Sequence, residues 1–202
     1  AKKDNSTTWI LSADVKLGLG DVRGQKEILD RAVAKFPDDA IVFLKRGESL
    51  FNDPKSARDA ISDFNKALQL RPDMWQAYRL RALANMTLYQ KDEAIRDFRA
   101  AVKIDPYNDN LLYGLISDLL RDGEKMNEAL DIASEALIKR PRDVDAMATI
   151  GALFASSNKH PEAARFYKMA FDIDKSDRIA QQYLDSLLNS TPPNTAEAQQ
   201  VL

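Results

Sequence analysis

Two stretches of the chain share one pattern. Residues 60–72 read AISDFNKALQLRP, and residues 94–106 read AIRDFRAAVKIDP. In each stretch two alanines lie seven residues apart, a phenylalanine lies between them, and a proline follows. Seven residues make about two turns of an α-helix, so the alanines and the ring share one helix face. The proline has no N–H and crowds the preceding turn, and it therefore predicts the end of that helix.

The same pattern recurs at a period of 34 or 35 residues. The recurring prolines are Pro37, Pro72, Pro106 and Pro141, and the second alanines are Ala32, Ala67, Ala101, Ala136 and Ala170. Ahead of each such helix the sequence predicts another, which carries a small residue at Ala13, Gly47, Ala82 or Gly151. A small side chain lets two helices approach closely. One such pair cannot bury both its faces, so the pairs are expected to stack.

These residues resemble the tetratricopeptide repeat (TPR) family. Its pattern of a bulky residue, a small residue, Ala, an aromatic ring, Ala and Pro is matched by Phe43, Gly47, Ala60, Phe64, Ala67 and Pro72. Two units depart from the pattern. The first has Gln25 at the first alanine, and the fourth has Ile116 at the small position and Ala133 at the bulky one.

The resemblance implies an all-α fold, a right-handed α–α superhelix (solenoid) of about five helix pairs and a C-terminal capping helix. We expect an N-terminal tail at 1–5, a TPR array at 6–188 and a linker or tail at 189–202. Within the array we expect repeats at 6–39, 40–74, 75–108, 109–143 and 144–177, with the capping helix at 178–188. In that helix Gln181, Gln182, Asp185 and Ser186 are expected to face water.

Composition excludes several kinds of site. The 202 residues carry a net charge of −2, no cysteine and one histidine, so we expect no nucleic-acid surface, no metal site and no cysteine nucleophile. No glycine-rich phosphate loop occurs, and no cofactor is expected. His160 precedes Pro161, which favours a cap or loop role over catalysis. No apolar run is long enough to span a membrane, and we expect a soluble chain that is not an enzyme.

The resemblance also implies a binding surface, because first helices line a concave groove in the family. The positions that correspond to this groove are candidates for contact with a protein or peptide partner. They are Leu44, Lys45, Glu48, Phe51, Arg79, Leu80, Leu83, Met86, Asn110, Tyr113, Ser117 and Arg121. Apolar side chains among cations would suit a segment with apolar anchors and a carboxylate. Packing between neighbouring first helices is the alternative role for the apolar ones.

Three functional hypotheses follow. The main one is a non-catalytic protein–protein interaction module that binds a peptide or protein in the groove. The second is self-assembly as a scaffold or homo-oligomer, which Trp75, expected at an exposed helix start, and the short cap suggest. The third is an accessory TPR domain of a larger enzyme, which the Pro192-Pro193 tail suggests. The compartment stays open between the cytoplasm and an extracytoplasmic space such as the bacterial periplasm.

Overall fold

A computed structural model describes residues 5–122 and 125–201, and every regular element in these ranges is a helix. The chain divides into two compact units, one ending at Asp105 and the other beginning at Pro106. The helices of the first unit are α1 (Ser6–Gly18), α2 (Val22–Lys35), α3 (Ala40–Phe51), α4 (Ala57–Leu70), α5 (Trp75–Thr87) and α6 (Lys91–Ile104). Those of the second are α7 (Asp109–Asp122), α8 (Met126–Lys139), α9 (Val144–Ser156), α10 (His160–Ile173), α11 (Asp177–Leu188) and α12 (Thr195–Val201).

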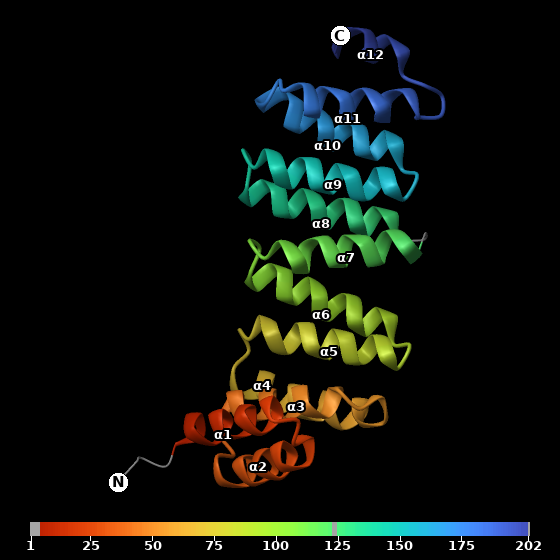
Figure 1. Ribbon diagram of the computed structural model, residues 1–202. Coiled ribbons are helices and arrows are strands. Elements are labelled where there is room, and N and C mark those ends of the chain that lie inside the picture. The colour runs from red at the N-terminus through yellow and green to blue at the C-terminus, as the bar shows by residue number, and fades with distance from the viewer. Residues whose placement is uncertain (1–4, 123–124, 202) are drawn as a thin grey trace. The chain divides into compact units, whose positions relative to one another are not determined.

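Helices α1 to α10 form the five predicted pairs, α1–α2 to α9–α10, and within each unit consecutive helices run back and forth (Figure 1). In four pairs the second helix ends two residues before a recurring proline, for example at Lys35 before Pro37. The all-helical fold class is therefore confirmed for the described residues.

Side-chain caps begin several of the helices. Asn5 accepts a hydrogen bond from the Thr8 amide, and Asp143 accepts one from the Ala146 amide, both at 2.9 Å. Each bond satisfies a backbone N–H that has no partner within its own helix. Helix α5 has no such cap, because it begins two residues after Asp73 and places Met74 at the cap position without a side-chain bond.

The first and second helices of a pair touch where the small residue meets the bulky one. A Cβ atom added to Gly47 in α3 would lie 2.6 Å from Cε1 of Phe64 in α4, and one added to Gly151 in α9 would lie 3.0 Å from Cε1 of Tyr167. The rings of Phe64 and Tyr167 are buried. At these positions the close approach of two helices requires glycine.

The connection within three of the pairs contains a residue with a positive φ angle. Gly20, Tyr89 and Asn158 have φ of 76°, 59° and 61°, and each lies seven residues after the small residue of its unit. The α3–α4 connection is one residue longer and contains a short 3₁₀ turn at Pro54–Ser56, whose Lys55 amide is bound by Asp53. Asp53 therefore caps this turn, and α4 itself begins at Ala57.

The C-terminal segment differs from the expected linker or tail. Residues 195–201 form α12, which packs on α11 (Figure 1). Asn194 accepts a hydrogen bond from the Glu197 amide at 3.2 Å, and Tyr183 of α11 donates one to Glu197. Ala198 and Ser186 are buried, so the expectation that Ser186 faces water is wrong. Helix α11 is therefore followed by a further helix.

Substitutions at two glycines test the helix contact. We expect Gly47→Ala to destabilise the protein by about 1–3 kcal/mol, because the buried Phe64 ring leaves no room for a methyl group. Gly114→Ala in α7 is the matched control, because nothing lies within 4 Å of its added Cβ. There we expect a gain of about 0.5–1 kcal/mol from helix propensity. Urea unfolding measures both changes. Equal effects of the two variants would contradict the contact.

Candidate functional site

The candidate surface of the first unit is the face that α3 and α5 share. Its candidate residues differ in how far their side chains reach solvent. Leu44 is buried in the core of the unit, and Phe51 and Leu80 are half-buried against that same core. Leu83 and Met86 are half-buried on α5. Packing between helices therefore accounts for Leu44, and the apolar groups that reach solvent lie mainly on α5.

The charged candidates of this face differ in their ion pairing. The Nζ atom of Lys45 lies 3.3 Å from a carboxylate oxygen of Glu48, one turn along α3. Arg79 is exposed on α5 and forms no ion pair with any described residue. Arg79, Leu83 and Met86 are spaced at i, i+4 and i+7, so they share one face of the helix. The exposed guanidinium therefore lies beside half-buried apolar side chains.

Two other arginines of the first unit are occupied by structural contacts. Arg46 of α3 forms a bidentate pair with Asp63 of α4, both N···O distances being 2.7 Å. Arg81 of α5 pairs in the same way with Asp97 of α6, at 2.8 and 2.5 Å. The hydrogen bonds that Arg46 donates to Asp63 raise the pKa of Arg46, and those that Arg81 donates to Asp97 raise the pKa of Arg81. Both arginines remain charged and tie the two helices of a pair together.

Each of these arginines also reaches back to the preceding second helix. The Nη1 atom of Arg46 lies 3.4 Å from Asp30 of α2, and that of Arg81 lies 2.6 Å from Asn65 of α4. Each arginine thus links three successive helices, and we call these two sets of contacts the arginine clasps. Neither arginine is available to a partner without loss of a clasp.

The second unit has apolar residues at the clasp positions. At the repeat spacing, Arg81 and Asp97 correspond to Leu115 and Ile132 in the fourth pair, and to Ile150 and Phe166 in the fifth. All four are at most 4% exposed. The arginine and the aspartate are therefore replaced together, so neither pair is left with an unpaired buried charge.

The candidate residues of the second unit all lie on α7. Asn110 and Arg121 are exposed, and Tyr113 and Ser117 are half-buried. Arg121 is bound to Asp118 at 2.7 Å. Burial raises the pKa of the Tyr113 hydroxyl. Tyr113 therefore stays neutral near pH 7.

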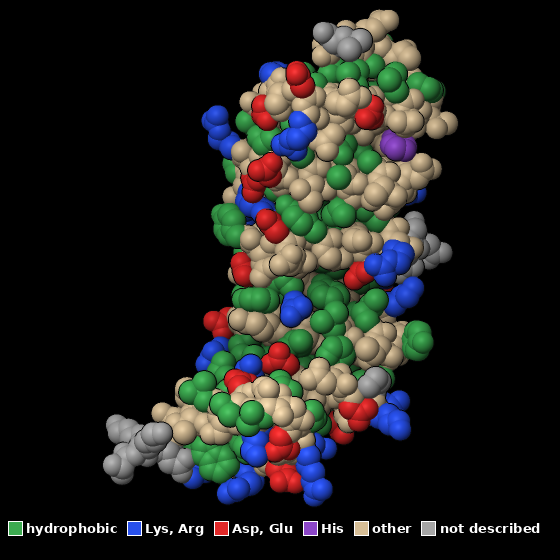
Figure 2. All heavy atoms as spheres, viewed as in Figure 1, with side chains coloured by type: hydrophobic (Ala, Val, Ile, Leu, Met, Phe, Trp, Pro, Cys, Tyr) green, Lys and Arg blue, Asp and Glu red, His purple; other side chains and the backbone are tan. Residues whose placement is uncertain are grey.

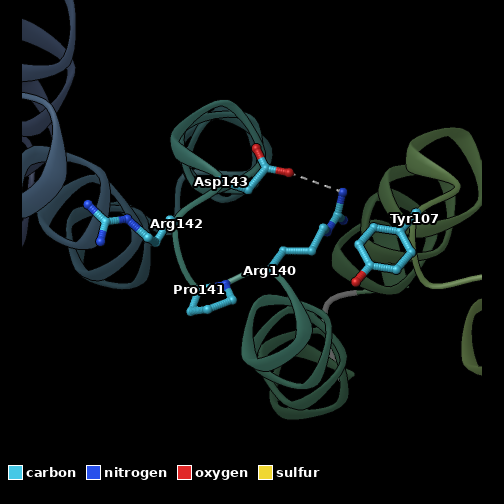
Figure 3. Close-up of a pocket in the computed structure, with 5 residues that line it drawn as sticks. All are labelled: Tyr107, Arg140, Pro141, Arg142 and Asp143. Carbon is cyan, nitrogen blue, oxygen red and sulfur yellow. Dashed lines mark ion pairs between the residues drawn. The ribbon is translucent and has the colours of Figure 1, made fainter.

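A shallow pocket between α8 and α9 contains a buried arginine that the sequence analysis missed. Arg140 is 7% exposed, and its Nη1 atom lies 2.6 Å from Asp109. The same atom lies 3.5 Å from Asp143, which lines the pocket with it (Figure 3). Its Nε and Nη2 atoms have no hydrogen-bond partner among the described residues and are covered by protein atoms. An anion cannot reach them in this conformation, so Arg140 ties helix ends together. The Arg-Pro dipeptide gives no signal of this, because Arg71-Pro72 repeats it with an exposed Arg71.

Among residues 5–122 and 125–201, no group of three or more His, Cys, Asp or Glu side chains is placed to hold a metal ion. None of the helices described is both long and apolar enough to cross a bilayer. On the face seen in Figure 2, hydrophobic side chains are interspersed with charged ones.

Comparison with known proteins agrees with the repeat geometry. Residues 56–109, which contain the α3–α4 turn, α4, α5 and α6, match the family model described as tetratricopeptide repeat. Over these residues the chain belongs to the tetratricopeptide repeat (TPR) family.

The TPR chain is similar to curated proteins that are much longer than itself. It is 26% identical over 166 residues to the STIP1 homolog of Dictyostelium discoideum, covering 80% of this chain and 26% of that protein. It is 30% identical over 120 residues to serine/threonine-protein phosphatase T of Aspergillus oryzae, covering 58% of this chain and 25% of that protein. The chain therefore spans about a quarter of the length of these relatives.

Solved structures share the fold of the TPR chain. The crystal structure of YrrB, described as a TPR protein with an unusual peptide-binding site, is similar with a TM-score of 0.58 at 18% identity. The match covers 89% of this chain and 92% of YrrB. At this level of identity the similarity shows the fold alone.

Paired substitutions test the arginine clasp of the first unit. We expect Arg46→Leu to destabilise the protein by about 3 kcal/mol, because Asp63 is then buried without its partner. Adding Asp63→Ile reproduces the apolar pair of the second unit, and we expect the double variant to recover at least half of that loss. Thermal unfolding of both variants and of the wild type measures these changes.

The control for this experiment is Arg23→Leu, which removes an exposed ion pair with Glu27 on α2. We expect it to change stability little, because solvent screens such pairs. A double variant no more stable than Arg46→Leu alone would contradict the view that the two kinds of pair are equivalent.

Proposed function

We propose that the chain is a non-catalytic protein-interaction module that binds a peptide or protein segment on the first-helix face of its first unit. The observation that carries the proposal is the exposed guanidinium of Arg79, which forms no ion pair with a described residue and lies beside Leu83 and Met86 on α5. Leu83 and Met86 are half-buried, so the part of their apolar surface that reaches solvent can still be buried against a partner. Arg79 would pair with a carboxylate of that partner.

The ion pairing of the surrounding residues supports Arg79 as the recognition cation. Arg46 and Arg81 are held in the clasps, and Lys45 is paired with Glu48. A carboxylate arriving at Arg79 displaces no existing ion pair, whereas at the other three cations it must compete with one. Glu48 on α3 is exposed, and its carboxylate would repel a strongly acidic partner segment that lies over α3. The proposed partner segment therefore combines apolar anchors with a single carboxylate near α5.

The first-helix face of the second unit has a different chemistry. Asn110, Tyr113 and Ser117 offer hydrogen-bonding groups, and Arg121 is already paired. We propose this face as a second contact surface that selects polar groups. The proposal for Arg79 does not depend on it.

An accessory role within a larger enzyme is a second candidate function. The chain spans about a quarter of a relative that is named as a phosphatase. In this role the surface around Arg79 would bind the partner and a separate domain would supply the chemistry. Both roles use the same binding surface, and they differ in whether a separate catalytic domain is joined to the chain.

Selection of binding peptides tests the proposed surface. A phage-displayed random peptide library is selected on the immobilised chain, and the consensus peptide is labelled for fluorescence anisotropy. We expect apolar residues with one acidic residue in the consensus. Arg79→Ala should weaken binding about tenfold, because a charge-assisted hydrogen bond is lost. Leu83→Ala should weaken it by a similar factor.

Matched controls for this test lie on other helix faces. Arg99→Ala removes an exposed arginine from the second helix α6, and Ile138→Ala removes an exposed apolar side chain from α8. We expect neither to change the affinity. Equal losses for Arg79→Ala and Arg99→Ala, or no loss at Arg79 and Leu83, would place binding elsewhere and refute the proposal.

A further inference from the structure

One edge of the Arg140 guanidinium has no acceptor. Its Nη1 atom lies 2.6 Å from Asp109 and 3.5 Å from Asp143, whereas Nε and Nη2 have no hydrogen-bond partner among the described residues. Arg140 is 7% exposed, and buried donors that lack an acceptor cost free energy. An acceptor that arrives from outside the chain would recover this loss. The pair of N–H groups at Nε and Nη2 is called the free edge of Arg140 below.

The arginine clasps show which group such an edge binds in this chain. In both clasps Nε and Nη2 hold the two oxygens of one carboxylate, as Arg46 holds that of Asp63. The Nη1 atom of Arg46 lies at the same time 3.4 Å from a second carboxylate, that of Asp30. Arg140 has the Nη1 contact, with Asp109, and lacks the carboxylate on the other edge. Two parallel N–H groups match the two oxygens of a carboxylate, so the missing acceptor is best supplied by one.

The ring of Tyr107 lies beside the guanidinium and is weakly held. Its centroid is 6.0 Å from Cζ of Arg140, and Figure 3 shows the two side chains next to each other. Tyr107 is 65% exposed, and its hydroxyl donates a hydrogen bond to the carbonyl oxygen of Lys139 at 3.3 Å, which is long for a bond between two oxygens. Exposed side chains change rotamer within nanoseconds. The ring can therefore move without any change in the helix packing.

The arrangement around Arg140 is not repeated in the first unit. The ring of Tyr107 and the carboxylate of Asp109 contact this arginine from the segment that leads into α7. At the repeat spacing, Arg71 is the equivalent arginine of the first unit, and it is exposed. Asp38 stands there in place of the ring and Ala40 in place of the acid. Arg71 is therefore a matched control for Arg140.

We propose that the free edge of Arg140 binds an acidic side chain of a polypeptide partner when the Tyr107 ring moves aside. The pocket beside it is shallow, so it does not enclose a free small molecule, whereas a partner segment can lie across it. Asp143 lines the same pocket and repels a run of acids, so the partner places a single carboxylate here. The site shares no residue with the surface around Arg79, and it stands independently of the proposed function.

Nuclear magnetic resonance of the arginine Nε–H groups in the ¹⁵N-labelled chain tests this site directly. The probes are a blocked tripeptide with a central glutamate, the same peptide with a central glutamine, and sodium acetate. The glutamate peptide should shift the Nε–H signal of Arg140 until it saturates, because a charge-assisted hydrogen bond forms there. The glutamine peptide should not shift this signal, and acetate should bind more weakly than the glutamate peptide. The signal is assigned by its loss in Arg140→Met.

Variants around the pocket test the geometry through the backbone amides of the same chain. Arg140→Met should abolish the shifts that the glutamate peptide induces in the amides near the pocket, and Arg71→Met should leave them unchanged. Asp143→Asn keeps a capping side chain for the Ala146 amide and removes a like charge, so it should lower the dissociation constant by about threefold or more. Tyr107→Ala should lower it by a similar factor, because the closed form no longer competes with binding.

Three results would overturn the proposal. They are equal shifts with the glutamate and glutamine peptides, acetate that binds as tightly as the glutamate peptide, and a titration that Arg140→Met leaves intact. Circular dichroism checks that each variant is folded. Should Arg140→Met fail to fold, Asp143→Asn and Tyr107→Ala still decide, because a purely structural Arg140 predicts no gain in affinity from either. Loss of binding at Arg79 does not affect the signal of Arg140, so the two proposals fail separately.

Discussion

The fold depends on how closely the two helices of a pair approach. At Gly47 a single added Cβ atom would lie 2.6 Å from the buried ring of Phe64. The two helices can pack this closely because residue 47 has no side chain. The fourth pair meets the same need with the sizes reversed, because Ile116 occupies the small position and Ala133 the bulky one, both 0% exposed. In both pairs one large and one small side chain thus fill the space between the helices, but in the fourth pair the larger one lies on the first helix.

A second constraint is the pairing of charge where successive helices meet. The first unit uses the arginine clasps, in which Asp63 and Asp97 lose nearly all solvent and accept two hydrogen bonds each from an arginine. The second unit uses apolar residues at the same positions, such as Leu115 and Ile132. A buried ion pair gives little net stability over a well-packed apolar pair, so both solutions are physically equivalent. The clasps have a consequence for recognition, because they remove two of the cations of the first unit from contact with a partner.

The sequence predicted the helix pairs well because few residue types can replace those that mark the period. Examples are the small residue at Gly47 and the proline at Pro72. It did not predict α12, where Asn194 and Glu197 give a cap signal that lies beside a Pro-Pro turn. It also did not separate Leu44, which is buried, from Leu83, which reaches solvent. Both are leucines on a first helix, and only the position of the neighbouring helix decides between them. Trp75, expected to be exposed, is half-buried, which removes one reason to place self-association there.

The central claim is that the face shared by α3 and α5 holds a polypeptide partner, with Arg79 on its carboxylate. A crystal structure of the chain with a selected peptide tests this claim most directly. The account predicts a peptide that lies over the first helices, with a carboxylate within hydrogen-bond distance of Arg79 and an apolar side chain against Leu83. A peptide bound only to the second helices, with Arg79 still in solvent, would contradict it.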